Sequence, residues 1–568
     1  MPTCKNCTTD FPITEQGKTF YARIDVPTPT HCPDCRQQRR AAWRNERVFY
    51  SRKCSLCGKA MIAIYSEDPP RLASGEAGKP FTVYCLDCWW GDKWGGEEYG
   101  AAYDPQRSFF EQFKALQQLV PRINLYQKNN VNSDYTNHTD HAKNCYICAD
   151  VGYGEELYYS KWIIKSADCV DSYQLEDCQL CYQSMYGVGN YNCNFTFLCY
   201  SCRDTDYLYD CVGCTDCFMS GNLRNKKFVF RSQQLSEADY RVARAKVDLG
   251  SYRQAAALFA EYRQLLAGSL HKFATIVRSQ DCSGDYIDQG KNVRASFGIV
   301  DGEDCSYCYD SGWFKDTYDA FESAFDIQRQ YETHACNRTT FSQFTTVSYD
   351  ASNLRYCDLC HSNKNLFGCV GLRHKQFCIL NKQYSEEEYQ ALVKHIIAKM
   401  TTDGEYGEFF PIALSPFGYN ETSAQDDFPL TKEQALAKGW AWQDHLPGTF
   451  GKETVLAAAL PDNITEAGDD LLQAVLACQT CKKNYKLIKQ ELEFYRRKNL
   501  SIPRSCPDCR YLERMSLKNP NRLHHRQCMC EQAGHGHAGR CPVEFETTYT
   551  PDRPERVYCE ECYQKEIY

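Results

Sequence analysis

The middle of the chain, from about residue 127 to residue 400, alternates short apolar segments with polar turns. Segments rich in Tyr, Ile, Val and Phe are separated by Gly, Asp and Asn. From Cys145 to Cys217 every gap between cysteines is a multiple of three, and four of the spacings repeat at 21 residues. Short strands and turns at a fixed period are typical of a β-solenoid. We therefore predict one coil per 21-residue repeat, with stacked cysteines forming small apolar ladders inside.

The two halves of this region also repeat each other. The string NLRNKKF at 222–228 returns as GLRHKQF at 371–377, an offset of 149 residues. Each string precedes a helix start of capping-box form, at Ser236 and at Ser385. A helix at the end of a stack covers strand edges that would otherwise be exposed. We expect solenoid, closing helix, solenoid and closing helix, in that order.

Three further helices are predicted outside the solenoid. Asp104 and Pro105 have the form of a helix start, and an apolar stripe follows from Phe109 to Leu119. The string TKEQ at 431–434 predicts a short helix through Lys438, and a second helix is expected near 464–477.

Close cysteine pairs occur near both ends of the chain in one repeated arrangement. Two C-x2-C pairs are separated by 24 residues, and the second lies within the string CPDCR. Another close pair begins after a further 18 residues, and a fourth pair that could join it lies farther along the chain. The arrangement recurs 474 residues later. It predicts four sites: Cys4, Cys7, Cys32 and Cys35; Cys54, Cys57, Cys85 and Cys88; Cys478, Cys481, Cys506 and Cys509; and Cys528, Cys530, Cys559 and Cys562.

Four thiolates brought together by two such pairs form a tetrahedral zinc site with no open position, which is structural rather than catalytic. The same ligands also bind iron–sulfur clusters, so that alternative stays open. At the fourth site the first pair is C-x-C, and Cys541 lies nearby with His524, His525, His535 and His537. Cys541 could replace a ligand there, whereas the histidines are interpreted as exposed loop residues.

The residues from Cys4 to Arg39 resemble a family of zinc-ribbon domains known in bacterial proteins. The resemblance rests on EQ at 15–16, FY at 20–21, Pro29 and CPDCRQQRR at 32–40, and the second copy has FYR at 494–496, Pro503 and CPDCR at 506–510. The whole chain is similar to long, uncharacterised bacterial proteins that combine such ribbons with a cysteine-rich middle. The resemblance implies metal binding and no particular activity.

These patterns predict a multidomain, mainly β protein. Its expected parts are a tandem zinc-ribbon module (1–100), a helix and linker (103–122), the two solenoid halves with their closing helices (127–270 and 271–400), an irregular linker with short helices (401–477), and a second tandem zinc-ribbon module (478–568).

Charge is unevenly distributed along the chain. The net charge is −8, yet residues 1–60 carry 11 Lys and Arg against 5 Asp and Glu, and residues 478–527 carry 13 against 4. Arginines at helical spacing beside the zinc sites suit phosphate or RNA binding. A solvated helix is the other interpretation. The candidate contacts are Arg36, Arg39, Arg40, Arg44, Arg47, Arg510 and Arg514.

Composition narrows the class of protein. The N-terminal residues lack the features of a signal peptide, and the apolar runs are too short for a membrane span, which favours a reducing cytoplasm where 36 cysteines stay thiols or bind metal. We find no phosphate loop, nucleophile elbow, dinucleotide fingerprint or HExxH helix, so no enzyme class has positive support. Carboxylates such as Asp204, Asp206 and Asp210 leave a β-helix hydrolase as a weak alternative.

The sequence therefore predicts a zinc-binding, non-enzymatic binding or scaffold protein that contacts RNA or a ribonucleoprotein through its basic ends. Two alternatives remain. One is a protein–protein scaffold in which the basic ends contact the acidic solenoid of another copy, and the other is a protein that handles thiols or metal through its central cysteines.

Overall fold

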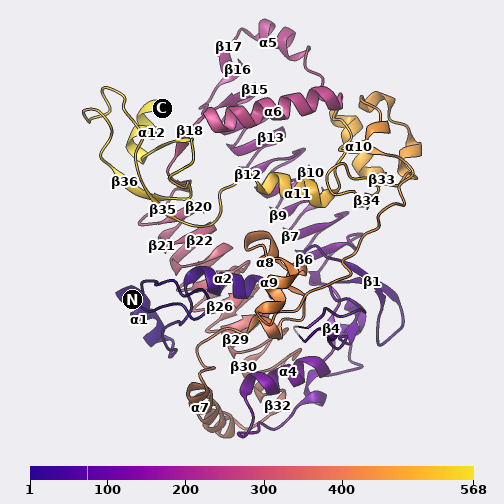
Figure 1. Ribbon diagram of the computed structural model, residues 1–568, viewed down its shortest axis with the longest axis vertical. Coiled ribbons are helices and arrows are strands. Elements are labelled where there is room, and N and C mark those ends of the chain that lie inside the picture. The colour runs from indigo at the N-terminus through magenta and orange to yellow at the C-terminus, as the bar shows by residue number, and fades with distance from the viewer. Residues whose placement is uncertain (73) are drawn as a thin grey trace. The chain divides into compact units, whose positions relative to one another are not determined.

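The computed structural model describes residues 1–72 and 74–568. It is mainly β, with a β-solenoid in the middle (Figure 1). Groups of four cysteines lie near both ends of the chain. The chain divides into two compact units. Unit 1 joins Met1–Tyr126 to Thr275–Leu446, and unit 2 joins Gln127–Ala274 to Pro447–Tyr568. Each terminal module therefore folds with one solenoid half: the N-terminal module with the second half, and the C-terminal module with the first.

The solenoid half of unit 2 is an 11-stranded sheet of mostly parallel neighbours, together with the pair β8 and β10. Its strands are β5 (Gln127–Lys128), β6 (Thr136–Asp140), β7 (Cys148–Gly152), β8 (Glu155–Tyr158), β9 (Lys161–Ile164), β10 (Ala167–Val170), β11 (Tyr173–Glu176), β12 (Met185–Val188), β13 (Tyr191–Tyr200), β14 (Arg203–Val212), β15 (Thr215–Gly221), β16 (Lys227–Phe230) and β17 (Gln233–Gln234).

One coil of this solenoid contains 12 residues, so the predicted 21-residue coil is wrong. Strand neighbours pair twelve positions apart, as Tyr191 with Arg203 and Cys199 with Cys211 do. A left-handed residue recurs at every third position, for example Leu198 with a φ of 57° and Ser201 with a φ of 52°. Each coil is thus built from four three-residue sides. The true period along the chain is three residues, and 21 is one of its multiples.

The predicted interior ladders are present. The cysteine of each side directly follows the left-handed residue and points inward, where it is buried with Leu, Ile and Val. The Cys202 thiol lies 3.5 Å from the carbonyl oxygen of Tyr200 and 3.6 Å from that of Cys211. The Ser184 hydroxyl donates in the same way to the carbonyl oxygens of Tyr182 and Cys193. Leu157 and Val229 take the equivalent position on neighbouring coils, so it is an apolar interior position, and at Cys202 a small side chain with a donor fills it.

The change Cys202→Ser is expected to alter the free energy of unfolding by less than about 1 kcal/mol, because serine keeps the size and the donor. The change Cys202→Leu is expected to destabilise by about 1–3 kcal/mol through overpacking. Thermal melting of the two variants beside the wild type measures both effects. A severe loss for serine together with tolerance of leucine would contradict the small-donor account.

The solenoid half of unit 1 is a 14-stranded sheet with the same coil. Its strands are β19 (Ile276–Val277), β20 (Gly284–Asp288), β21 (Lys291–Arg294), β22 (Ser296–Ser306), β23 (Tyr309–Lys315), β24 (Tyr318–Phe321), β25 (Ala324–Gln328), β26 (Tyr331–His334), β27 (Asn337–Thr340), β28 (Gln343–Thr346), β29 (Tyr349–Arg355), β30 (Lys364–Phe367), β31 (Gln376–Ile379) and β32 (Lys382–Gln383).

Two coils of this half depart from twelve residues: the first has eleven, since Ile276 pairs with Ile287, and a later one has thirteen. Tyr318 pairs with Tyr331, thirteen positions on, and the register shifts between β23 and β25. Phe325 and Asp326 both have left-handed backbones there, with φ of 62° and 56°. The shorter and the longer coil break the cysteine spacing in multiples of three, which explains why the second half looks less regular in the sequence.

Helices close both solenoid halves as predicted. In unit 2, α5 (Glu237–Arg244) has Ser236 as N-cap and packs on β16, and α6 (Tyr252–Gly268) lies along β14 and β15 (Figure 1). In unit 1, α7 (Glu386–Asp403) begins with a complete capping box at Ser385 and packs on β31.

The remaining elements belong to the terminal modules and linkers. Unit 1 holds α1 (Glu15–Arg23), α2 (Pro33–Ala41), β1 (Tyr50–Lys53), β2 (Ala60–Ala63), β3 (Val83–Tyr84), α3 (Leu86–Trp90), η1 (Gly96–Tyr99), α4 (Phe109–Leu119), β4 (Arg122–Ile123), η2 (Ile412–Leu414), η3 (Tyr419–Glu421), α8 (Ser423–Asp427) and α9 (Lys432–Ala437). Unit 2 holds β18 (Leu270–Lys272), η4 (Ala457–Ala459), η5 (Ile464–Glu466), η6 (Asp469–Leu472), β33 (Leu476–Ala477), β34 (Asn484–Tyr485), α10 (Lys489–Lys498), α11 (Pro507–Met515), β35 (His524–Gln527), β36 (Glu544–Thr547), β37 (Arg556–Tyr558) and α12 (Glu560–Ile567).

Two helix predictions need correction. Helix α4 starts after Ser108, whose hydroxyl accepts from the Glu111 amide, and not at Asp104. Residues 464–477 form two short 3₁₀ turns and a strand, because Gly468 interrupts the pattern and the following residues pair as β33 with β34. Helix α9, by contrast, has the predicted cap at Thr431.

A buried carboxyl group ties the linker of unit 1 to its N-terminal module. The Tyr50 hydroxyl donates to Glu421 Oε1 at 2.7 Å, and the Gly418 amide donates to Oε2 at 2.6 Å. Burial raises the pKa of Glu421 to about 7, although these two donors lower it in part.

Between pH 4.5 and 7 the folded protein therefore holds a proton on Glu421 that the unfolded chain has lost. The stability of unit 1 should fall across this window as pH rises, by about 3 kcal/mol from this group. The change Glu421→Gln removes the titration, so the difference in unfolding free energy between wild type and variant should drift with pH only inside the window. A constant difference from pH 4.5 to 7.5 would contradict the prediction.

Candidate metal centres and their attachment to the solenoid

The first four-cysteine group is Cys4, Cys7, Cys32 and Cys35, as predicted. Their sulfur atoms all lie within 4.8 Å of one another, with Cys7 Sγ and Cys32 Sγ 3.6 Å apart. Asn6 donates from Nδ2 to Cys35 Sγ at 3.2 Å. Phe11 is the buried apolar residue that packs with these cysteines, so this knuckle has very little core of its own.

The second and third groups also have the predicted members. Cys54, Cys57, Cys85 and Cys88 converge in unit 1, and Cys478, Cys481, Cys506 and Cys509 converge in unit 2. In both, the backbone amide of the third cysteine donates to the sulfur of the first, at 3.3 Å from Cys85 to Cys54 and at 3.2 Å from Cys506 to Cys478. Burial alone would raise the pKa of Cys54 and Cys478, but backbone amide donors lower each to about 6.

The fourth group differs from the prediction by one ligand. Cys541 joins Cys528, Cys559 and Cys562 in place of Cys530. The loop after Cys530 folds back so that the Cys541 amide donates to the Cys530 carbonyl at 2.8 Å, which brings Cys541 Sγ to 4.0 Å from Cys559 Sγ. Cys530 instead faces His535, at 3.2 Å from its Nδ1.

Each of these groups supplies four protein ligands and could hold a metal ion. A site closed by four thiolates keeps no position for water or substrate, so its role is structural. The amide-to-sulfur bond recurs in the fourth group, from Cys559 to Cys528 at 3.2 Å.

The candidate RNA-binding arginines of unit 1 have other partners. Helix α2 lies against β24 and β26 of the solenoid. Arg36 Nε lies 3.0 Å and Arg40 Nη1 3.1 Å from Asp319 Oδ1, and all three side chains are at most 1% exposed. Arg39 donates to both carboxylate oxygens of buried Glu332, at 2.7 and 2.8 Å.

The other two arginines of this set are also paired. Arg44 lies 2.5 Å from Glu46 and 3.8 Å from Glu322, in a fully buried position. Arg47 pairs with Asp426 at 2.6 Å and keeps 23% of its side chain exposed. The expectation of an exposed phosphate-binding face, and that of a solvated helix, are therefore both corrected for α2, whose residues from Cys35 to Ala41 are all buried.

Unit 2 repeats this attachment with corresponding residues. Arg510 Nε lies 2.9 Å from Asp171 Oδ2, and Arg514 Nη1 lies 2.8 Å from Asp171 Oδ1. Arg510 also covers the ring of Tyr159 at 4.7 Å, as Arg36 covers Tyr307 at 5.1 Å. In both units the CPDCR arginine and the arginine one helical turn later thus hold one buried solenoid aspartate.

Aromatic packing strengthens the same attachment. The FY pair of each ribbon contacts a solenoid tyrosine: Tyr21 lies 5.2 Å from Tyr331, and Tyr495 lies 5.8 Å from Tyr182, between ring centroids. The residues that carry the family resemblance are therefore used for folding against the solenoid.

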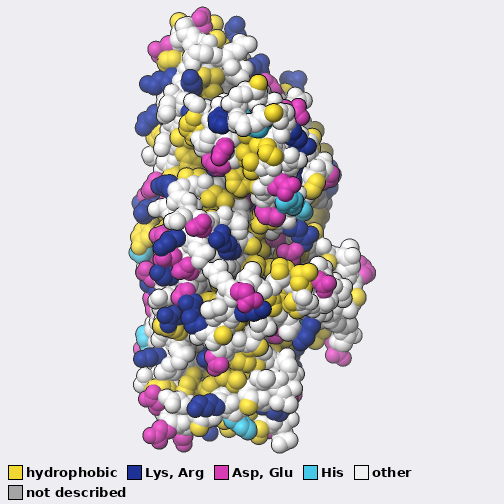
Figure 2. Space-filling model, turned by 90° about the vertical axis from the view of Figure 1, so that its left-hand side faces the viewer, with side chains coloured by type: hydrophobic (Ala, Val, Ile, Leu, Met, Phe, Trp, Pro, Cys, Tyr) yellow, Lys and Arg dark blue, Asp and Glu magenta, His cyan; other side chains and the backbone are white. Residues whose placement is uncertain are grey.

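Surface charges on the solenoid are largely matched along the stack. Lys143 pairs with Glu155 at 2.5 Å, and Glu303 pairs with both Lys291 and Lys315 at 3.0 and 2.8 Å. On the face shown in Figure 2, basic and acidic side chains are interspersed. None of the described helices is long and apolar enough to cross a membrane.

The carboxylates considered for a hydrolase are also engaged. Asp206 pairs with Arg244 at 2.7 Å and Asp210 with Arg224 at 3.0 Å, while Asp204 accepts from an asparagine twelve residues earlier at 2.7 Å.

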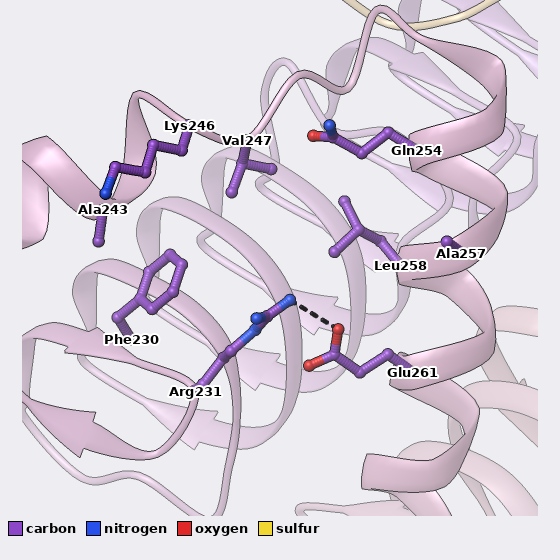
Figure 3. A pocket seen from close by; sticks show the side chains of 9 residues that line it. All are labelled: Phe230, Arg231, Ala243, Lys246, Val247, Gln254, Ala257, Leu258 and Glu261. Carbon is purple, nitrogen blue, oxygen red and sulfur yellow. Dashed lines mark hydrogen bonds and ion pairs between the residues drawn. The ribbon is translucent and has the colours of Figure 1, made fainter.

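A cavity of about 510 Å³ lies in unit 2 between the end of the solenoid and helix α6 (Figure 3). Phe230, Val247 and Leu258 give it apolar walls, and Arg231 pairs with Glu261 across it at 2.8 Å. Lys246 also lines this cavity.

The chain matches no protein-family model and no curated protein. Among solved structures, a proposed acetyltransferase from Desulfovibrio desulfuricans G20 is similar over 47% of this chain and 69% of its own, with 8% sequence identity and a TM-score of 0.11. That score is too low to carry an argument. Of what the family resemblance implies, the structure shows several four-cysteine groups near the termini that could hold metal.

Proposed function

We propose that this protein is a zinc-stabilised, non-enzymatic scaffold. The observation that carries the proposal is the recurrence, in both units, of a closed four-cysteine group whose following helix is fixed to the solenoid by a buried arginine–aspartate cluster. Zinc suits these groups because it favours four tetrahedral thiolates and has no redox chemistry. Metal would fold the ribbon, and the ribbon would stiffen the solenoid as a surface for a protein partner.

RNA is the less favoured partner. Six of the seven candidate arginines are buried in ion pairs or between packed elements, so the charge segregation seen in the sequence is satisfied inside each unit. The same finding disfavours contacts between the basic ends of one copy and the acidic solenoid of another.

Fluorescence anisotropy of a labelled single-stranded RNA with the full chain tests this choice. We expect weak binding that is abolished by 200 mM salt and unchanged by Arg47→Glu, the one candidate with a partly exposed side chain. Tight binding that survives this salt would overturn the choice of a protein partner. Elemental analysis of the same sample checks the metal, and iron in place of zinc would overturn that part of the proposal.

A further inference from the structure

A second set of ligand atoms lies beside the fourth four-cysteine group. Cys530 Sγ, one ring nitrogen of His535, one of His537 and Cys562 Sγ all lie within 4.8 Å of one another. Cys562 is also a member of the group formed with Cys528, Cys541 and Cys559. One sulfur therefore belongs to two complete sets of four ligands.

Both histidines are oriented as metal ligands are. His535 presents Nδ1 to Cys530 Sγ at 3.2 Å, and its other nitrogen lies 3.8 Å from a carboxylate oxygen of Glu566. His537 presents Nε2 to Cys562 Sγ at 3.5 Å, and its other nitrogen lies 2.8 Å from the carbonyl oxygen of Gly539. A metal-bound imidazole almost always has its second nitrogen against a carboxylate or carbonyl, which fixes the ring and its tautomer.

The loop that carries these histidines is built to fold over the fourth group. Gly534, Gly536 and Gly539 have φ of +92°, +90° and +66°, which favours glycine at each. The loop brings a ring nitrogen of each histidine to the same pair of sulfurs, and Lys565 Nζ donates to the His535 carbonyl at 2.7 Å.

The N-terminal module provides an internal comparison. Its strand β2 begins at Ala60, six residues after Cys54, whereas β36 begins at Glu544, sixteen residues after Cys528. The ten additional residues contain His535, His537 and Cys541. Cys541, which replaces Cys530 in the fourth group, therefore lies in the same insertion as the two histidines.

We propose that the fourth four-cysteine group and the ligands beside it bind two zinc ions that share the Cys562 thiolate. One ion is held by Cys528, Cys541, Cys559 and Cys562, and the other by Cys530, His535, His537 and Cys562. Five thiolates and two neutral imidazoles around two divalent ions leave a net charge of −1. This is less charge to place in a partly buried position than two separate four-thiolate sites would carry. This inference rests on the proposed zinc binding of the terminal modules and adds a fifth, binuclear position to it.

Zinc per chain, measured on the full-length protein, is the first test. We expect five zinc ions in the wild type and four in His535→Ala/His537→Ala. The matched control is His524→Ala/His525→Ala, on the neighbouring strand β35, which should keep five. His537→Cys retains a ligand and should also keep five, which separates loss of a ligand from misfolding of the loop.

Cadmium-113 NMR of the cadmium-loaded full chain tests the shared sulfur. Two resonances split by coupling between the metals are expected, and the splitting should vanish in His535→Ala/His537→Ala. Four metals in the wild type with no loss in the histidine variant would overturn the fifth site alone. Five metals without coupling would overturn the bridge, and absence of metal from the chain would instead overturn the proposed function.

Discussion

Chelation of the bound metal is expected to unfold the terminal modules while most of the solenoid keeps its backbone pairing. Apparent binding free energies of structural zinc sites are about 10–16 kcal/mol near pH 7, and in a small ribbon this is folding free energy. The first group should be the most dependent, because Phe11 is the fully buried apolar residue that packs with its cysteines. The second and third groups each belong to a large apolar cluster and should resist longest.

Hydrogen exchange read by mass spectrometry measures this order. Peptides around Cys4–Cys35 should lose protection first and those around Cys54–Cys88 and Cys478–Cys509 last, and zinc should restore all of them. Strands such as β13 and β14, which pair along their whole length, should stay protected. Unchanged exchange in the ribbons after verified metal loss would contradict a folding role for the metal.

The buried aspartates are expected to give the largest effects of any single substitution in the solenoid. Replacement of Asp319 by Ala leaves Arg36 and Arg40 buried without their shared partner. Breaking a buried ion pair from one side costs about 3–5 kcal/mol, because the remaining charge stays desolvated. The corresponding change in unit 2, Asp171→Ala, leaves Arg510 and Arg514 buried without their shared partner.

The effect should be confined to the unit that carries the substitution. Asp319→Ala should loosen α2, and Asp171→Ala should loosen α11, each visible in hydrogen exchange and in the melting of that unit. Asp350→Ala is the matched control, since Asp350 also pairs with an arginine on the solenoid but both side chains are more than one third exposed. We expect about 0–1 kcal/mol there. Equal effects for the buried and exposed aspartates would contradict the attachment mechanism.

The solenoid could be predicted from the chain, but its coil length could not. Cysteine spacings in multiples of three report the length of one side, because Cys199 and Cys202 occupy equivalent positions on successive sides. The number of sides per coil depends on how neighbouring coils pair, and a spacing of 21 satisfies the three-residue period as well as 12 does. Only the pairing of Cys199 with Cys211 decides between them.

The four-cysteine groups were predictable where sequence spacing fixes them. A C-x2-C turn brings two sulfurs together locally, and 15 of the 16 expected ligands belong to the expected groups. Cys541 and the two histidines reach their places through a glycine-rich loop whose path the spacing does not encode. Glycines on both sides of His535 were the available signal.

The arginines show why charge patterns alone mislead. A row of guanidinium groups beside a zinc knuckle suits phosphate and buried carboxylate equally well. Asp171 and Asp319 lie 148 residues apart, in a region full of aspartates at turns, so the sequence does not single them out. Their role follows from the folding of each terminal module onto a particular solenoid half.

The central claim is that metal sits in the terminal modules and not among the solenoid cysteines. The most direct measurement is elemental analysis of the full chain beside two variants, Cys32→Ser and Cys199→Ser/Cys202→Ser. We predict at least four zinc ions in the wild type, about one fewer in Cys32→Ser, and no change in the solenoid variant. Retention of all zinc in Cys32→Ser, with loss in the solenoid variant, would contradict the account.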